Sequence, residues 1–363
     1  MFTRQAVVAG SPAAGDDVPS PDVPELPDLP VAANDAFDAL GNATVNIAAP
    51  GVLTNDTLNG GEITAFDANG SSGGTIDLST DGSFRYTPAL DYVGQETFDY
   101  TVSNEGGSST ATVTMTSTGR GVFVNNTASA GGDGTQANPF NKLAAAVSEA
   151  QSGDTIFVAR GTGDGTGLGG SITLPMGVDL VGEGTGLILA QTVVEAGQNP
   201  VIRARVTCAG DNIIKGLSFN NTSEPAITIL NVSDVTVSDN TFSNGTSQYI
   251  DLQSFGGDVT LERNVFTDPP GNDFYIAALS GNGVLNIVDN EFFNTDSEPA
   301  RTLYEHEITS GSAISINFSN NRALGTSGQF SSGVEIIQFG GDARATISGN
   351  ELSGFSGNGL FLV

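Results

Sequence analysis

The 363-residue sequence contains no tryptophan, one histidine and one cysteine, and it has 12 lysine and arginine residues against 41 aspartate and glutamate residues. The formal net charge of −29 argues against binding of DNA, RNA or an anionic membrane, because affinity for phosphate comes from basic side chains. A single cysteine, Cys208, excludes an internal disulfide, and its small apolar neighbours predict a buried side chain. No apolar run approaches the length of a transmembrane helix, and the apolar core of residues 1–10 is too short for a signal peptide.

Glycine is abundant, with 48 residues, and Asn, Ser and Thr accompany small β-forming residues throughout. This composition predicts an all-β chain with many tight turns. In the second half of the chain, five short β-type runs each end in an asparagine, and an apolar residue follows two positions later. The asparagines are separated by 24, 26, 31 and 29 residues, and they are Asn240, Asn264, Asn290, Asn321 and Asn350. Self-similarity at this period predicts a solenoid.

Three segments are expected along the chain. Residues 1–30 alternate proline with aspartate and glutamate, which predicts a disordered, acidic, extended linker. Residues 31–118 contain runs of alternating apolar and polar residues separated by Asp-Gly and Asn-Gly turn signals. Such half-buried strands in under 90 residues predict an immunoglobulin-like (Ig-like) β-sandwich. Residues 119–363 carry the repeat.

The second segment also resembles a known family. Its motifs Asn34-Asp35-Ala-Phe37, Ala49-Pro-Gly-Val-Leu53-Thr-Asn55-Asp56, Asp81-Gly-Ser-Phe84-Arg-Tyr86-Thr-Pro88 and Gly94-Gln-Glu-Thr-Phe98-Asp-Tyr100 follow one another in order. They look like the bacterial cadherin-like, Ig-like repeats of large surface and secreted adhesins. The resemblance implies a spacer or adhesive module, in some members a calcium-binding one.

Calcium is the cofactor that the oxygen-bearing side chains of this segment indicate. Asn34, Asp35, Asn55 and Asp56 supply oxygen ligands near one end of the expected sandwich, with Asp38 and Asp91 as further partners. Ca²⁺ requires six to eight oxygen ligands, so these residues form a calcium site only if they converge. The alternative interpretation is that they are turn residues.

The third segment opens with a predicted helix. Asn138 is a good N-cap, Pro139 suits the first helical position, Phe140 to Ala150 present one apolar face, and Gly153 ends the helix. The surrounding pattern resembles the N-terminal cap of right-handed parallel β-helices of the pectate-lyase-like superfamily. We therefore expect an Ig-like sandwich followed by a right-handed parallel β-helix with one capping helix. Residues 358–363 look like the first strand of a further coil, so we expect a truncated C-terminus and self-association through the solenoid ends.

The periodic asparagines receive a structural interpretation. Each coil must turn sharply, asparagine tolerates a left-handed φ, and its amide can bond otherwise unpaired backbone groups. Stacked on successive coils, the amides are expected to form a ladder, and the residues two positions later are expected to stack in the core.

Catalysis is a weaker expectation. A polysaccharide lyase needs a base, often Arg or Lys, and a glycoside hydrolase needs paired carboxylates. The candidates are Arg263 and the segment containing Arg301, Glu305 and His306, which includes the only histidine. The alternative is that scattered cations solvate a sheet and that the segment is an ordinary strand with outward charges.

The first functional hypothesis is a fragment of a secreted or cell-surface bacterial adhesin-type protein, with a structural scaffold that binds glycans or neighbouring surfaces. The second is a polysaccharide lyase or glycosidase acting on acidic polysaccharide on the β-helix face. A third is a purely structural surface-layer or fibre component. The poverty in basic and aromatic groups favours the first, because an enzyme on sugars would use them for stacking and proton transfer.

Overall fold

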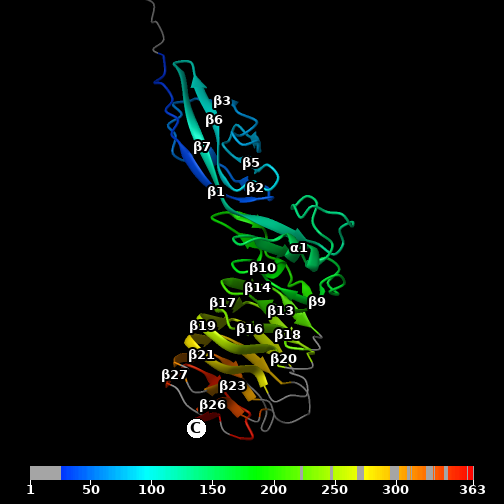
Figure 1. Cartoon of the computed structure of the whole chain (residues 1–363). Helices are drawn as coiled ribbons and strands as arrows, with labels where there is room; N and C mark the ends of the chain where they lie inside the picture. Colours follow the sequence, from blue (N-terminus) through cyan, green and yellow to red (C-terminus); the bar gives the residue numbers. More distant parts are fainter. Residues whose placement is uncertain are drawn as a thin grey trace, which may run out of the picture.

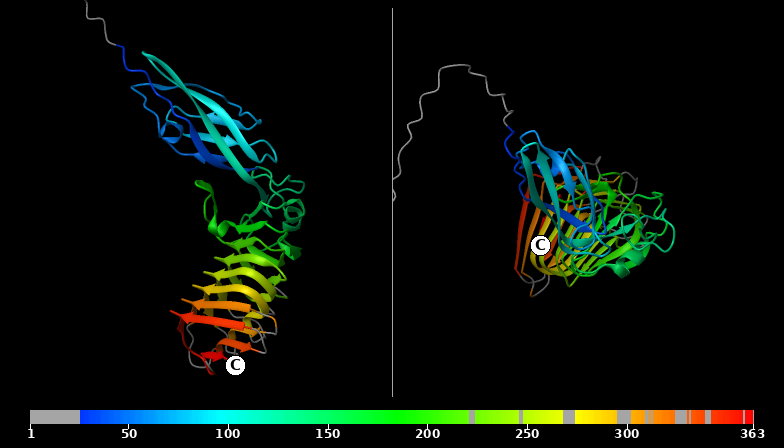
Figure 2. Two further views of the ribbon diagram at one scale, coloured as in Figure 1. Left: turned by 60° about the vertical axis from the view of Figure 1, so that its left-hand side comes forward. Right: turned by 90° about the horizontal axis from the view of Figure 1, so that it is seen from above.

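The computed structural model describes residues 26–220, 224–245, 248–267, 274–294, 302–308, 311, 313–323, 330, 332–338, 342–357 and 359–362. Within these residues the chain is all-β, and its one α-helix is short. Two parts lie end to end along an elongated molecule, an N-terminal β-sandwich and a stack of parallel strands (Figures 1 and 2). No helix in the described ranges is long and apolar enough to cross a membrane.

The N-terminal sandwich consists of two sheets. In the first, β1 runs parallel to β7, and β6 is antiparallel to both β7 and β3. In the second, β5 is antiparallel to β2 and β4. The strands are β1 (Asp35–Gly41), β2 (Val45–Ile47), β3 (Glu62–Phe66), β4 (Thr75–Leu78), β5 (Phe84–Thr87), β6 (Gly94–Asn104) and β7 (Gly107–Val124).

The alternating pattern of the strands places one face of each sheet in a shared core. Phe84 of β5 and Phe98 of β6 meet between the sheets with ring centroids 5.6 Å apart in an edge-to-face arrangement. Glu96 is also buried in this sandwich, where its carboxylate accepts hydrogen bonds from the Tyr86 hydroxyl and from the backbone N–H groups of Ser72 and Gly74. Because these donors replace water, the buried acid is satisfied by the fold.

The sandwich begins before the predicted boundary at residue 30. The carbonyls of Asp28 and Leu29 accept hydrogen bonds from the side chains of Asn104 and Asn59, so residues of the predicted linker are tied to the sandwich. The rest of that linker, residues 1–25, lies outside the described residues.

Strand β7 joins the two parts without a break. Its first residues pair with β6 in the sandwich, and its last four, from Gly121 to Val124, pair in parallel with β8 (Thr155–Val158). Among the described residues, one hydrogen-bonded sheet of 24 strands therefore includes β1, β3, β6 and β7 together with every strand of the stack except β11 (Leu187–Ile188) and β12 (Thr192–Val194).

The stack consists of three parallel ladders, named here first, second and third ladder. The first contains β9 (Gly169–Thr173), β13 (Val201–Cys208), β16 (Ile227–Leu230), β19 (Ile250–Glu262), β21 (Phe274–Val288), β23 (Thr302–Ile308), β26 (Ser332–Gln338) and β29 (Leu360–Leu362). The second contains the end of β7, β8, β10 (Asp179–Gly182), β14 (Asn212–Lys215), β17 (Ser233–Ser238), the later parts of β19 and β21, β24 (Ala313–Ser319) and β27 (Asp342–Ser348). The third contains the start of β13, β15 (Ser218–Asn220), β18 (Thr241–Ser243), β20 (Val265–Thr267), β22 (Glu291–Phe293), β25 (Arg322–Ala323) and β28 (Glu351–Leu352).

The inward side chains of the three ladders form one apolar core. In the third ladder, Phe219, Phe242, Phe266 and Phe292 stack on successive strands, with neighbouring ring centroids 4.8–5.1 Å apart. Cys208 is buried in the same core, and this burial raises the pKa of its thiol to about 12. The all-β prediction is confirmed, whereas closure of the ladders into a right-handed helix stays a prediction.

The helix differs from its prediction. Helix α1 spans Leu143–Glu149, so it begins four residues after Pro139. Phe140 instead forms an isolated parallel bridge with Val124, with backbone hydrogen bonds on both sides. A long-range strand contact therefore outweighs the local N-cap and proline signals. Leu143 and Ala146 of α1 are fully buried in the stack core.

Candidate functional site

Oxygen atoms converge at the end of the sandwich where the calcium site was predicted. The Tyr100 hydroxyl lies within 2.9–3.3 Å of five of them: both carboxylate oxygens of Asp56, Oδ2 of Asp35, and the carbonyls of Val52 and Ala33. A phenol carries a single proton and can donate it to only one acceptor. The cluster therefore has more acceptors than donors.

This surplus shows in the electrostatics of Asp35. Partial burial and then the negative charge of Asp56 raise the pKa of Asp35 to about 6, against the opposing hydrogen bond from Tyr100. A cation beside the two carboxylates would relieve both effects. In donor chemistry the cluster fits Ca²⁺, which prefers carboxylate and carbonyl oxygens. Within the described residues no group of three or more acidic, histidine or cysteine side chains is suited to a metal, so two carboxylates are what this end offers.

The two asparagines of the prediction contact backbone groups, and a side-chain hydrogen bond from Asn55 also opposes the rise in the pKa of Asp35. Asn55 donates its side-chain amide to the carbonyl of Asn34, and the Asn34 side-chain oxygen accepts the backbone N–H of Thr112. Both therefore brace the loops that carry Asp35 and Asp56. Of the further partners proposed from the sequence, Asp91 pairs through its carboxylate with Arg120, and Asp38 accepts a hydrogen bond from Gln191 through its backbone carbonyl.

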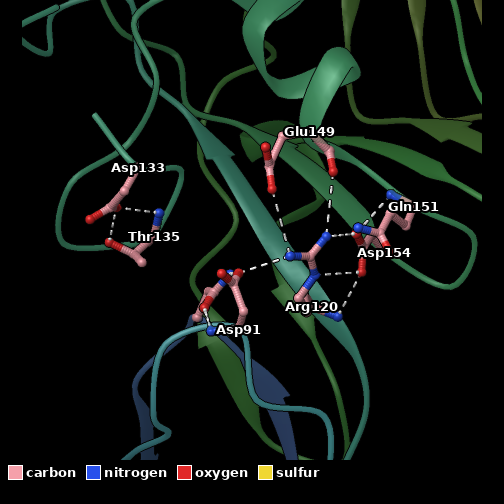
Figure 3. Close-up of polar contacts among 8 residues, drawn as sticks. Asp91, Arg120, Asp133, Thr135, Glu149, Gln151 and Asp154 are labelled. Atoms are coloured by element: carbon pink, nitrogen blue, oxygen red, sulfur yellow. Dashed lines mark hydrogen bonds and ion pairs between the residues drawn. The ribbon is translucent and has the colours of Figure 1, made fainter. Parts of the chain in front are cut away.

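Arg120 occupies the junction between the sandwich and the stack (Figure 3). Its guanidinium pairs with Asp91 at 2.8 Å and with Asp154 at 2.7 Å, and it lies 3.9 Å from Glu149. The hydrogen bond that Arg120 donates to Asp154 is the largest contribution that raises the pKa of Arg120 above its ordinary value. Asp91 belongs to the sandwich and Asp154 to the stack, so one buried cation joins the two parts.

Apolar contacts accompany this ion cluster. Phe123, Phe157 and Val181, on the outer face of the second ladder, belong to the same core cluster as the sandwich residues. The antiparallel hairpin of β11 (Leu187–Ile188) and β12 (Thr192–Val194) adds Leu187 and Val193 to that cluster. Sequence reasoning missed the junction, although a basic residue at a predicted domain boundary, in a chain with 12 of them, was a usable signal.

The periodic asparagines form a continuous hydrogen-bonded ladder. Each of four asparagines donates its amide to the side-chain oxygen of the next asparagine at 3.0–3.2 Å and to a backbone carbonyl of the preceding strand of the second ladder at 2.8–2.9 Å; the four are Asn240, Asn264, Asn290 and Asn321. These four side chains are at most 1% exposed. Asn350 ends the ladder and donates to the carbonyl of Phe318.

The left-handed turn lies one residue earlier than predicted. Positive φ values of 52–67° occur at the residues before the asparagines, which are Asp239, Arg263, Asp289, Asn320 and Gly349. The turn residue points outward, and the asparagine that follows can then direct its amide into the coil. Left-handed φ was therefore wrongly assigned to the asparagines.

Arg263 is held by acidic neighbours at this turn. Its guanidinium makes two hydrogen bonds to Asp239 on the preceding coil, at 2.8 and 2.9 Å, and it also pairs with Glu262 at 2.9 Å. The hydrogen bonds that Arg263 donates to Asp239 are the main cause of the raised pKa of Arg263. A guanidinium in this state cannot accept a proton, so the geometry argues against Arg263 as a catalytic base.

The other catalytic candidates are located only in part. Arg301 lies outside the described residues. Glu305 and His306 belong to β23 in the first ladder, in register with Ala277 and Ala278 of β21 and with Glu335 and Ile336 of β26. Their segment is thus a strand of the stack, as the alternative interpretation expected, and their side chains fall outside the described set.

Two adjoining grooves lie on the stack: one of about 520 Å³ along the second ladder, and one of about 720 Å³ at the turns that connect the first ladder to the second. Asp211 and Asp234 line both grooves, and Asp179 and Asp258 line the smaller one. Two of these acidic side chains bond to the backbone of the neighbouring strand. Asp179 accepts a hydrogen bond from the backbone N–H of Ile213, and Asp234 accepts one from the backbone N–H of Asp258. Burial, reinforced by the negative charge of Asp211, raises the pKa of Asp179 against the opposing hydrogen bond from Ile213 and the positive charge of Lys215.

Comparison with known proteins identifies the sandwich. Residues 27–119 match the family model of the bacterial cadherin-like domain. The cadherin-like domain thus includes the oxygen cluster around Tyr100 and ends inside β7, next to Arg120. Such a domain indicates a cell-surface or adhesion-type module. No curated protein and no solved structure matches the chain.

Proposed function

We propose that this chain is part of a secreted or cell-surface bacterial protein of the adhesin type, in which a cadherin-like spacer holds a glycan- or surface-binding scaffold. In this proposal the parallel stack is a right-handed β-helix. The junction carries the proposal, because β7, the Arg120 ion cluster and a shared apolar core connect the two parts without a linker. A rigid connection of this kind suits a module that holds a binding surface away from its anchor.

Calcium is the cofactor that we propose for the cadherin-like domain. Asp35 and Asp56 would bind it through their carboxylates, and Ala33 and Val52 through their carbonyls. When bound, the cation would supply positive charge to a cluster in which acceptors outnumber donors. Binding to the folded domain alone would raise its stability by mass action.

The binding role is tested by incubating the purified chain with immobilised pectate, alginate and glycosaminoglycans, with and without Ca²⁺. We expect retention of the protein without release of products. Shortened or unsaturated products that disappear in Arg301→Ala or His306→Ala would instead establish the lyase or hydrolase alternative. Absence of both retention and products would refute the binding role and leave a structural component.

A further inference from the structure

The outer face of the first ladder contains two buried polar atoms without a hydrogen-bond partner in the described part of the chain, Thr228 Oγ1 and Arg205 Nε. Thr228 lies in β16 and is 3% exposed. Arg205 lies in β13, and its terminal nitrogen pairs with Glu224 at 2.6 Å. Buried polar groups in native proteins are almost always satisfied, so such exceptions require an explanation.

The unsatisfied atoms lie beside a buried acid. Thr228 is in register with Thr207 of β13 on one side and with Asp251 of β19 on the other. Successive strands of a parallel ladder present in-register side chains on the same face, so Thr228 and Asp251 are neighbours on the outer face. Asp251 is 8% exposed and accepts one hydrogen bond, at 2.7 Å, from Gln253.

Electrostatics link Arg205 to the same place. Burial raises the pKa of Asp251, and the hydrogen bond from Gln253 and the positive charge of Arg205 oppose this shift. Arg205 lies two residues before Thr207, so its side chain leaves the same face of β13. A donor, a hydroxyl and a carboxylate acceptor are thereby gathered on three consecutive strands.

The fold itself gains no hydrogen bond from the hydroxyl of Thr228. Valine has nearly the shape of threonine and would fill the position of Thr228 without leaving a hydroxyl unsatisfied. A group that destabilises the fold at a rigid, ordered position is typical of a functional site. A ligand that hydrogen-bonds to Thr228 would remove the deficit.

We propose that Arg205, Thr228 and Asp251 form a subsite for neighbouring hydroxyl groups of a saccharide. The Arg205 side chain is 38% exposed and its pair with Glu224 lies at the surface, so it moves aside as the saccharide enters and opens access to the buried atoms. The Nε–H of Arg205 then donates to one hydroxyl oxygen, the carboxylate of Asp251 accepts from a hydroxyl, and the hydroxyl of Thr228 does either. Glu224 and Asp251 together outweigh the charge of Arg205, which favours a neutral saccharide over a uronate. This inference rests on the proposed function, because it names the surface through which the scaffold would bind a glycan.

The test compares isosteric variants of the full chain. Thr228→Val, Asp251→Asn and Arg205→Lys each remove one hydrogen-bonding group, and Thr173→Val is the matched control at an exposed position of the same ladder. Calorimetric titration would use neutral hexasaccharides of glucose, mannose and galactose, with a hexagalacturonate for comparison. We expect the first three variants to lose about tenfold in affinity for a neutral probe, the control to bind like wild type, and Thr228→Val to raise the Tm.

Three results would overturn the inference. If wild type binds a saccharide and all four variants bind it equally, the subsite is wrong, although the proposed glycan-binding role survives. If wild type binds no saccharide in this titration or on the immobilised polysaccharides, the subsite and the binding role fail together, and an ordered water becomes the partner of Thr228. Tighter binding of the hexagalacturonate than of every neutral probe would refute the ligand class.

Discussion

Removing one amide from the asparagine ladder should destabilise the stack severely. Asn264 is fully buried, and its side-chain oxygen accepts both the backbone N–H and the amide of Asn240, each at 3.2 Å. Its own amide donates to the carbonyl of Val237 at 2.8 Å and to Asn290 at 3.0 Å. Asn264→Ala breaks all four contacts in one place.

The magnitude follows from the groups left without partners. Asn290 keeps the backbone N–H of residue 264 as a donor, and Asn240 keeps the carbonyl of Ile214 as an acceptor. The backbone N–H of Asn240 loses the bond to Asn264 and the carbonyl of Val237 loses a donor. Each buried polar group left unsatisfied costs about 1–3 kcal/mol, so we expect the two groups together to cost about 2–6 kcal/mol.

The measurement is urea denaturation followed by far-UV circular dichroism, because the chain has no tryptophan. Asn286→Ala is the matched control, since the half-buried amide of Asn286 makes only long contacts of 3.4 and 3.5 Å with Thr260 and Asn317. The control should lose under about 0.5 kcal/mol. If the Asn264 variant falls within that range, the ladder does not stabilise the coils and the reasoning is wrong.

Three further predictions concern the other charged groups. The pKa of Asp35 is raised in the folded state, so its contribution to stability is full below its ordinary pKa of 3.8 and is lost as the pH rises through about 6. Asp35→Asn should therefore flatten the dependence of Tm on pH. Added Ca²⁺ should raise the Tm of wild type at pH 7 but not that of the variant. Arg120→Met leaves Asp154, which is 5% exposed, without its cation, and should lower the free energy of unfolding in urea by about 3 kcal/mol. Asp91→Asn changes a half-exposed partner and should lower it by less than about 1 kcal/mol. Equal losses would contradict the assignment of Arg120 as a buried link. Arg263→Ala breaks an exposed pair, should cost less than about 1 kcal/mol, and should not change any turnover of acidic polysaccharide; loss of turnover would restore Arg263 as a catalytic candidate.

Boundaries and turns were the least predictable features. The N-cap and proline signals at Asn138 and Pro139 are local, and they were overruled because Phe140 completes hydrogen bonds to a strand that ends at Val124. The period of the asparagines marked each turn, but a period cannot show which residue of the turn takes the left-handed φ. The residue before each asparagine takes the left-handed φ, because this turn lets the asparagine point its amide inward.

The calcium prediction also shows the difference between what local sequence indicates and what the tertiary structure decides. Local sequence placed Asp35 and Asp56 in loops of one domain, but the position of Tyr100 between them depends on the pairing of β6 with its neighbours. Asp38 and Asp91 looked equivalent in the sequence, yet both are engaged at the junction with the stack.

The sequence by itself determined the all-β class, the alternating strands of the cadherin-like domain and the positions of the five asparagines, because these depend on local periodicity and residue type. The tertiary structure decided what meets across coils and across the junction. Arg120 joins Asp91 and Asp154, 29 and 34 residues away, and Arg205, Thr228 and Asp251 share a face only because three strands stack in register. Such contacts follow from register and chain winding, which a single sequence does not specify.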